Sequence, residues 1–541
     1  MTDARPALQA LAGLGTADVI GTERAGFEPA VQLLTGHVFS KDAHSTALPP
    51  LPTPTETSMD WNRAERSILD PICRSRKEAS RVMRITRILA RPFLAAMVAA
   101  AAAAASTPAV FAAELMAAAR LSIRADDAKR HISALADDAL EGREGGSRGG
   151  RAAGSYVVSH LEKLGLEPAG DNGSYYQQFG GMRNILALAR GSDPSVAHEL
   201  IVVGAHYDHV GYGNSGNSYG PFGFVHNGAD DNASGVAGLI EVAEALQHLP
   251  NRPRRPILFA FWDGEEKGLL GSYHFLRVRP AMLAPMSVVF SVNLDMIGRL
   301  RGERLEVYGA RTSEGLRTAV VRSNNRQGAA PLELTFDWAI EEDSDHYPFI
   351  TAKIPTVMFH TGLHDQYHRP SDDVQLINFD GIEPVARLTL DFVTELANEP
   401  GSPRSFRPQS RSESDATKKA LESQAHGELA PATALQPSQT VNGQVTPAAP
   451  QRPRWGIGTR ADAGEPLNPI VVRINAGSPA ALAGLALGDR VVAIDGGDVL
   501  SQADMVTRLA AAGGCVALDV DRKGRIVRLE MKSSEQTTAA P

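Results

Sequence analysis

Polar side chains of the kinds that bind metal ions follow the apolar runs of this 541-residue sequence, at the points where strands would end. Each run has its own group: His206-Tyr207-Asp208 after residues 200–205, Asp263-Gly264-Glu265-Glu266 after 257–262, Asp295 after 288–294, and Tyr367-His368 shortly after 354–359. A turn at residues 228–235 carries Asp230 and Asp231 directly before a helical pattern. Ligands of open α/β sheets bind outside the carboxyl ends of the strands, so we expect these side chains to meet in one crevice.

The residue types favour a hydrolytic metal site. Imidazole and carboxylate groups without a thiolate suit zinc or a similar divalent ion. One histidine and one carboxylate for each ion, with a further carboxylate shared, would hold two ions about 3.5–4 Å apart. Asp208 is expected to accept the second N–H of the His206 imidazole. In the Glu265-Glu266 pair, one carboxylate can ligate while its neighbour takes a proton from water.

A single histidine or a single acidic pair is ordinarily structural, but the whole set in this order predicts a metal centre. The elements that must position it are five apolar runs, predicted as strands at residues 184–189, 200–205, 257–262, 288–294 and 354–359. Between the second and third, residues 234–249 place apolar side chains on one helical face. We therefore expect residues 113–398 to form an α/β domain with a mostly parallel, doubly wound sheet flanked by helices.

Charge and cysteine content exclude two other classes of protein. The chain has 54 basic and 62 acidic residues, a net charge of −8, and no concentrated basic stripe, which argues against nucleic-acid binding. The two cysteines, Cys73 and Cys515, stand far apart, so this is not a scaffold built on disulfides.

The first 112 residues are predicted to lie outside the folded domain. Residues 83–112 combine arginines, a short apolar stretch and small residues ending at Ala112, which is the pattern of a secretory signal peptide. The apolar stretch is shorter than the roughly 20 residues of a membrane span, so we expect a periplasmic or secreted protein without a stable span. Residues 1–82 are expected to be unstructured, or to precede a true start at Met83.

The motifs HYD, GADDNASG, DGEE, NLD and YHRPSDD, in this order, resemble those of the M28 zinc aminopeptidases. The resemblance covers residues 128–397 and extends to the family's bacterial secreted members through LEGR at 140–143 and LGLEP at 164–168. It implies two zinc ions, although other divalent ions remain open. The implied ligands are His206 and Asp295 for one ion, Glu266 and His368 for the other, and Asp230 between them.

The same resemblance implies roles for other residues. Glu265 would be the general base, and Tyr367 would hydrogen-bond the developing oxyanion. The Asp230–Asp231 peptide bond would be cis. His209 and His226 lie near the implied ligands in the sequence, and we expect them on the loop rather than at the metal.

Two segments further along the chain bear on the same crevice. The acidic run Glu341-Glu342-Asp343 is either a solvated loop or a binding site for the free amine of a substrate. The following Ser344-Asp345-His346 is expected to form part of the crevice wall and to bind no metal.

The last part of the chain resembles a PDZ domain of the type found with bacterial proteases, over residues 454–532. A flexible linker rich in proline, serine and glutamine is expected before it at 399–453, and a tail after it at 533–541. The loop Trp455-Gly456-Ile457-Gly458 matches the carboxylate-binding loop of such domains, which implies that backbone N–H groups capture a C-terminus while the peptide adds as a strand. The alternative is a small β-rich domain that only packs on the peptidase.

The sequence thus predicts a secreted two-zinc aminopeptidase that removes N-terminal residues from peptides, joined to a module that binds peptides or a protein partner. Two alternatives stay open. One is a metal-dependent carboxypeptidase or amidohydrolase on the same fold, and the other is a non-catalytic peptide-binding protein.

Overall fold

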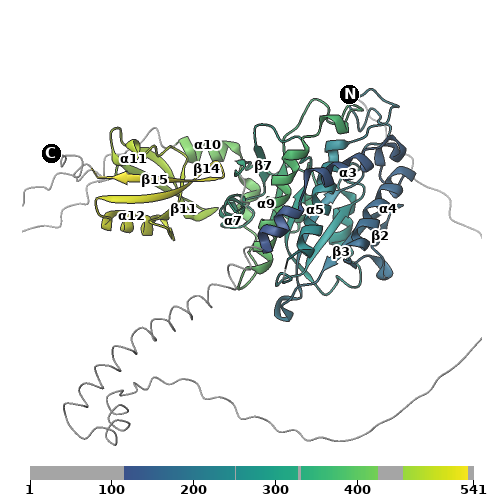
Figure 1. Ribbon diagram of the computed structural model, residues 1–541, viewed down its shortest axis with the longest axis horizontal. Coiled ribbons are helices and arrows are strands. Elements are labelled where there is room, and N and C mark those ends of the chain that lie inside the picture. Colours follow the sequence, from purple (N-terminus) through teal and green to yellow (C-terminus); the bar gives the residue numbers. More distant parts are fainter. Residues whose placement is uncertain (1–114, 250, 327–329, 424–454, 534–541) are drawn as a thin grey trace, which may run out of the picture. The chain divides into compact units, whose positions relative to one another are not determined.

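The computed structural model describes residues 115–249, 251–326, 330–423 and 455–533 (Figure 1). The upstream segment expected at 1–82, the signal peptide expected at 83–112, residues 424–453 of the expected linker and the last eight residues lie outside the described residues. Everything described belongs to one compact unit, Ala95–Pro541. None of the helices in these ranges is long and apolar enough to cross a membrane.

A mixed sheet forms the centre of the larger domain, in the order β1-β3-β5-β4-β6-β9-β7-β8, with β2 paired to β3. Its strands are β1 (Glu167–Pro168), β2 (Tyr176–Phe179), β3 (Met182–Ala189), β4 (Glu199–His206), β5 (Ile257–Trp262), β6 (Ser287–Leu294), β7 (Arg304–Tyr308), β8 (Glu333–Phe336) and β9 (Thr356–His360). The central strands β5, β4, β6 and β9 run parallel, whereas β3 and β7 join them antiparallel. The expected α/β fold is confirmed, with antiparallel strands added at both sides of the parallel centre.

Helices cover both faces of this sheet. They bury apolar side chains there, because successive residues of the central strands point to opposite faces and are apolar on both. In β5, Phe259 and Phe261 pack in the cluster that contains α3, α5 and α9, while Trp262 packs with Phe275 and Phe349 on the opposite face. The helices are α3 (Ala125–Leu135), α4 (Arg148–Lys163), α5 (Gly235–Gln247), α6 (Leu270–Arg277), α7 (Leu316–Asn324), α8 (His346–Thr351) and α9 (Phe379–Asn398), with 3₁₀ turns η1 (Asp138–Arg143), η2 (Asp171–Gly173), η3 (Pro194–Val196) and η5 (Val374–Leu376) and the π-helical turn η4 (Ala229–Ser234).

Residues 399–423 differ from the expected flexible linker. They contain the turn η6 (Pro408–Ser412) and the helix α10 (Asp415–Ser423). Between these elements, Glu413 accepts hydrogen bonds from Arg311 and Arg407, and both arginines are buried. Arg407 and Glu413 of this segment thus form a largely buried ion pair, which the composition of the segment does not indicate.

Residues 455–533 form a second sheet in which every strand pair is antiparallel, in the order β10-β11-β12-β14-β15 with β13 paired to β12. The elements are β10 (Ile457–Asp462), β11 (Glu465–Ile474), α11 (Pro479–Leu482), β12 (Arg490–Ile494), β13 (Gly497–Asp498), α12 (Gln502–Ala511), β14 (Cys515–Arg522) and β15 (Arg525–Lys532). Trp455, Val471 and Leu518 belong to its own apolar core. Strand β10 is an edge strand of this sheet.

A buried ionic network joins the second domain to the first. Arg311 follows β7, and its guanidinium binds Asp462 at 2.8 and 2.9 Å and stacks at 3.7 Å on the ring of Trp338. Asp462, the last residue of β10, also binds Arg490 at 2.6 Å. Beside this pair, Glu465 accepts hydrogen bonds from the backbone and side chain of α7, so the contact is polar yet closed to solvent.

Candidate metal centre

The parallel strands carry the predicted side chains to one edge of the central sheet. His206 is the last residue of β4 and pairs with Trp262, the last residue of β5, while Asp295 directly follows β6. Glu265 and Glu266 follow β5 after one turn. Because the carboxyl ends of neighbouring parallel strands share an edge, these side chains converge as expected.

Asp231, not Asp230, lies where the shared carboxylate was expected. The carboxylate of Asp231 lies between two histidines, with Oδ1 3.4 Å from Nε2 of His206 and Oδ2 3.1 Å from Nε2 of His368. Asp230 turns the other way, and its Oδ1 accepts hydrogen bonds from the Gly298 N–H and the Ser234 hydroxyl at 2.7 and 3.0 Å.

The reason is local backbone geometry. Asp231 has φ −102° and ψ 97°, which is extended rather than helical, so consecutive side chains point in opposite directions. The expected cis bond is likewise displaced by one residue and lies between Asp231 and Asn232. Both predictions for Asp230 were therefore wrong by one position.

Around Asp231 the side chains form two sets, each with one histidine and one further carboxylate. In the first set, Nε2 of His206 lies 3.3 Å from Oδ1 of Asp295. In the second, Nε2 of His368 lies 3.1 Å from Oε2 of Glu266. These five residues, His206, Asp231, Glu266, Asp295 and His368, are called the metal cluster below.

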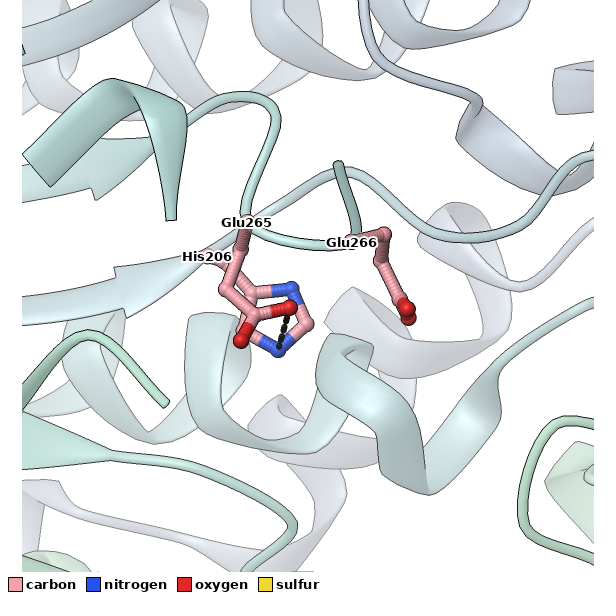
Figure 2. Close-up of side chains that lie close together, drawn as sticks. All are labelled: His206, Glu265 and Glu266. Atoms are coloured by element: carbon pink, nitrogen blue, oxygen red, sulfur yellow. Dashed lines mark ion pairs between the residues drawn. The ribbon is translucent and has the colours of Figure 1, made fainter. Parts of the chain in front are cut away.

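Glu265 and Glu266 have different surroundings although they are adjacent (Figure 2). Glu265 lies beside the His206 imidazole, with Oε2 4.0 Å from Nε2, and burial raises its pKa well above the usual range, helped by nearby carboxylates. Burial opposes ionisation of Glu266 as well, but the hydrogen bonds of His209 and His368 outweigh it and hold its pKa well below the usual range. Environments that separate two carboxylates in this way suit one for proton transfer and the other for ligation.

Asp208 occupies a different place from the one expected. The nitrogen Nδ1 of His206 lies 3.2 Å from the backbone carbonyl of Asp208, whereas the nearest carboxylate oxygen is 3.8 Å away. That carboxylate oxygen, Oδ1, instead accepts a hydrogen bond from the backbone N–H of Glu265 at 3.1 Å. Asp208 thus orients His206 through its main chain and the Glu265 loop through its side chain.

His209 was expected on the loop rather than at the metal, and it lies on the loop after β4 with its side chain in contact with the predicted ligand Glu266. It is fully buried, and its Nδ1 lies 2.8 Å from Oε1 of Glu266 and 3.6 Å from Oδ2 of Asp231. The feature of the sequence that could have predicted this contact is the position of His209, three residues after His206 and just beyond the end of β4. His226, in contrast, stays on the loop as expected, where its Nε2 lies 2.6 Å from the Ser218 hydroxyl.

Arg143 is a further buried residue, for which the sequence motifs predicted no role. Its guanidinium donates to the carbonyl oxygens of Tyr207 at 3.0 Å, Asn227 at 2.6 Å and Gly228 at 2.9 Å. It thereby ties the loop after β4 to the turn that carries Asp231. Its presence in the LEGR motif was the available signal.

Tyr367 and His368 lie on the loop that follows β9. Their rings stack at 3.9 Å, and His368 has the left-handed backbone φ of +52° that a residue with a side chain rarely adopts. The carbonyl of His368 is held by the backbone N–H of Tyr219 and the hydroxyl of Ser218. Tyr367 lines the same cavity as the metal cluster, and its role at an oxyanion stays a prediction.

The donor set fits a divalent cation. Asp231 is almost completely buried, and its Oδ2 accepts no hydrogen bond although His368 Nε2 is close. Buried polar atoms are ordinarily paired, so an orphaned carboxylate oxygen between two histidines indicates a cation as its partner. Imidazole and carboxylate without thiolate are ligands that suit zinc in hydrolytic sites.

Comparison with known proteins places this geometry in a family context. Residues 184–393 match the model of peptidase family M28, and residues 470–522 match a PDZ domain model. Aminopeptidase YwaD of Bacillus subtilis (strain 168) is 29% identical over 239 residues, which is 42% of this chain and 47% of that protein. Leucine aminopeptidase 1 of Trichophyton rubrum is 28% identical over 230 residues, 40% of this chain and 58% of that protein. The matches thus span about half of these relatives.

Among solved structures, the LapA aminopeptidase of Legionella pneumophila resembles this chain with a TM-score of 0.45 and 20% identity, over 53% of this chain and 76% of that one. A zinc aminopeptidase from Bacillus subtilis, BSAP, has a TM-score of 0.41 and 18% identity, over 52% of this chain and 98% of that one.

Proposed function

Residues 184–393 are a peptidase family M28 domain and residues 470–522 a PDZ domain, and from this premise we propose that the chain is a two-zinc aminopeptidase with a peptide-binding module. The observation that carries the proposal is the pair of candidate ligand sets around Asp231, with the carboxylate of Glu265 beside them. Relatives named aminopeptidases support it.

His206 and Asp295 would hold one zinc ion, His368 and Glu266 the other, with Asp231 shared. Bound in this way, the ions supply electrophilic polarisation of a peptide carbonyl and acidify a water molecule. Glu265 takes the proton of the attacking water and passes it to the departing amine, and its raised pKa suits this transfer. Tyr367, on the cavity lining, donates a hydrogen bond to the oxygen that develops negative charge.

The test of this activity uses the full chain loaded with zinc and aminoacyl-anilides with a free α-amine, compared with the same substrates after N-acetylation. An aminopeptidase cleaves only the free-amine set and stops when a chelator removes the metal. Cleavage of acetylated anilides would instead support the amidohydrolase alternative. The carboxypeptidase alternative needs a peptide with a free C-terminus as substrate; a relative that bears on it is the glutamate carboxypeptidase 2 homolog of Caenorhabditis elegans, 33% identical over 120 residues, 21% of this chain and 13% of that protein.

The PDZ domain is proposed to bind the C-terminus of a peptide at Trp455-Gly456-Ile457-Gly458. This loop precedes and enters the edge strand β10, beside which a peptide can add as a further strand. Calorimetric titration of the full chain with an N-acetylated peptide, which the peptidase cannot shorten, should give binding that is lost when the peptide C-terminus is amidated. Equal binding of acid and amide would leave the domain a structural role.

We also propose that the protein acts outside the cytoplasm after removal of the segment that ends at Ala112. Amino-terminal sequencing of the protein from its native cells should then begin at Ala113. A start before Met83 would contradict both the cleavage and the proposed translation start.

A further inference from the structure

The metal cluster opens into a cavity of about 460 Å³ whose floor is a patch of the central sheet. Strands β7 and β9 are antiparallel, with Glu306 opposite His360 and Tyr308 opposite Met358. Because side chains alternate along a strand, these four share one face, while the intervening Val307 belongs to the core on the other. The floor of the cavity therefore consists of two cross-strand pairs, Glu306 with His360 and Tyr308 with Met358.

Apolar side chains also line this cavity, and one of them is the immediate neighbour in the chain of a metal-cluster residue. Met296 directly follows the ligand Asp295, and Met358 lies on the strand next to it; both are almost completely buried. The ring of Tyr308 and the side chain of Leu363 add to this surface. An aliphatic chain of several carbons fits such a lining, since the flexible thioether side chains adapt to it.

The loop between β8 and α8 adds three carboxylates to the cavity: Asp337, Glu341 and Asp343, called the acidic wall below. Among the described residues, no lysine or arginine lines the cavity, and no member of the acidic wall forms an ion pair with either. Asp343 lies 3.9 Å from His346, and the charges of His360 and Lys418 act on Asp343 and Asp337. The acidic wall therefore places carboxylates in the cavity that no lysine or arginine pairs directly.

The cavity is more than an acidic surface, because its inner end is the metal cluster. There the buried Oδ2 of Asp231, which accepts no hydrogen bond, lines the same space and indicates a bound cationic species. Zinc would balance the charge of the ligands, but the acidic wall is a separate set of carboxylates. Clefts lined by one sign of charge concentrate ligands of the opposite sign.

We propose that this cavity receives the side chain of the substrate's N-terminal residue and selects lysine and arginine. These residues combine an aliphatic stem with a cationic end, which matches a methionine-lined surface followed by carboxylates. The inference rests on the proposed aminopeptidase activity and names its substrate class. It also assigns Glu341 and Asp343, the first and last residues of the acidic run, to binding the side chain of the substrate's N-terminal residue.

The experiment compares kcat/KM of the zinc-loaded full chain for anilides of arginine, citrulline, lysine, norleucine and leucine. Citrulline has the size and shape of arginine without the charge, and norleucine has the carbon chain of lysine without the terminal ammonium group. The expected preference for the cationic member of each pair is about tenfold, as several carboxylates act on one cation near the surface. Equal values within the pairs would overturn the proposal while leaving the aminopeptidase activity established.

Variants assign the preference to the acidic wall. Glu341→Gln with Asp343→Asn should lower the arginine-to-citrulline ratio toward one with little change for citrulline. Glu342→Gln is the matched control, because Glu342 lies between them but accepts a hydrogen bond from Tyr273 at 3.0 Å and does not line the cavity. Equal losses for arginine and leucine substrates in the double variant would show that the acidic wall binds the α-amine and would overturn the proposal.

A binding measurement separates this proposal from the proposed activity. Zinc-loaded Glu265→Ala should bind argininamide about tenfold more tightly than citrullinamide by calorimetry. If the wild type cleaves no anilide while this difference in binding is found, the proposed activity fails and the selectivity of the cavity stands. If neither amide binds preferentially, the selectivity fails whatever the enzyme cleaves.

Discussion

At the scale of single residues, the division of labour between Glu265 and Glu266 depends on which groups surround each carboxylate. Glu266 receives hydrogen bonds from His209 and His368, so its charge is stabilised and available to a cation. Glu265 has no such donors to its side chain and lies 4.0 Å from the His206 imidazole. The same residue type therefore serves ligation at one position and proton transfer at the next.

Replacing Glu265 by glutamine should lower kcat by about 10²–10⁴-fold, the contribution of a positioned general base, because the amide cannot accept the proton. Zinc content should stay at the wild-type value, since Glu265 lies outside the metal cluster. Stopped-flow or steady-state kinetics on a free-amine anilide, with metal analysis of the same preparation, checks both. Loss of zinc together with activity would make Glu265 a ligand and contradict its role as the base.

The two adjacent aspartates give a paired prediction. Asp231→Asn should lose bound zinc, because the shared carboxylate supplies one oxygen to each histidine set. Asp230→Asn should retain it, because an amide oxygen still accepts the Gly298 N–H. Metal analysis after dialysis against a weak chelator distinguishes them, and the opposite pattern would restore Asp230 as the bridging ligand.

The contrast at this position shows what residue types and spacing can predict. His206, Glu266, Asp295 and His368 were singled out because they come at or after the ends of apolar runs, and the structure brings their side chains together. Their role as ligands, which the family resemblance implies, stays a prediction. The choice between Asp230 and Asp231 depends on an extended residue inside a turn, which no periodicity encodes. The contact of His209 with Glu266 depends on a side-chain direction that spacing leaves open.

At the scale of elements, the strands that were predicted are those buried on both faces. β5 was predicted with its observed bounds, Ile257–Trp262, because all six residues are apolar and buried. β7 and β8 are short, carry charged residues on one side, and were not predicted. Strand β7 supplies half of the cavity floor, and β8 leads into the loop that carries the acidic wall. Part of the surface that would contact a substrate side chain was therefore not visible in the sequence.

Helix α5 carries a buried carboxyl group that makes stability depend on pH. Burial raises the pKa of Glu241 to about 8, against the opposing hydrogen bond from the Arg124 N–H. The folded state thus binds a proton that the unfolded state releases near 4.5, so the contribution to stability is complete below that pH and is lost as the pH rises through about 8.

Glu241→Gln should therefore flatten the fall in the free energy of unfolding between these two pH values, which in the wild type is at most about 1.4 kcal/mol per pH unit. Urea unfolding of the metal-loaded chain and of the variant at several pH values measures the difference. Parallel curves for the two proteins would show that Glu241 is not the titrating group.

At the scale of the whole molecule, buried ion pairs join the two domains, beside the apolar side chain of Ile526, which packs against the core of the first domain. Arg311 binds both Asp462 and Glu413, and each of these carboxylates has a second arginine, Arg490 and Arg407. Such a network is satisfied only when all its members are present, because a buried charge without its partner is costly. Composition could place the two domains in order along the chain, but it could not show that they would share buried ion pairs.

Arg311→Ala should destabilise the chain by about 3 kcal/mol, the lower end of the range for breaking a buried pair, because each partner keeps another arginine. Arg322→Ala is the control. Arg322 binds Asp498 in the PDZ domain at 2.8 Å, but the two side chains are 38% and 60% exposed, so its loss should cost under about 0.5 kcal/mol. Urea midpoints compare the two, and equal shifts would contradict a special role for the buried network.

The position of Arg311 has a thermodynamic consequence. One face of its guanidinium covers Trp338, whose neighbours Asp337 and Ala339 line the cavity, while its nitrogens hold the end of the edge strand β10. Suppose that a peptide added to β10 changes the free energy of this contact and thereby the affinity of the cavity for a substrate analogue. Linkage then requires that the analogue change the affinity for the peptide by the same factor. Under that condition, the affinity of each domain for its ligand would report whether the other domain is occupied. Titrating the peptide with and without the analogue, and the analogue with and without the peptide, measures the coupling twice.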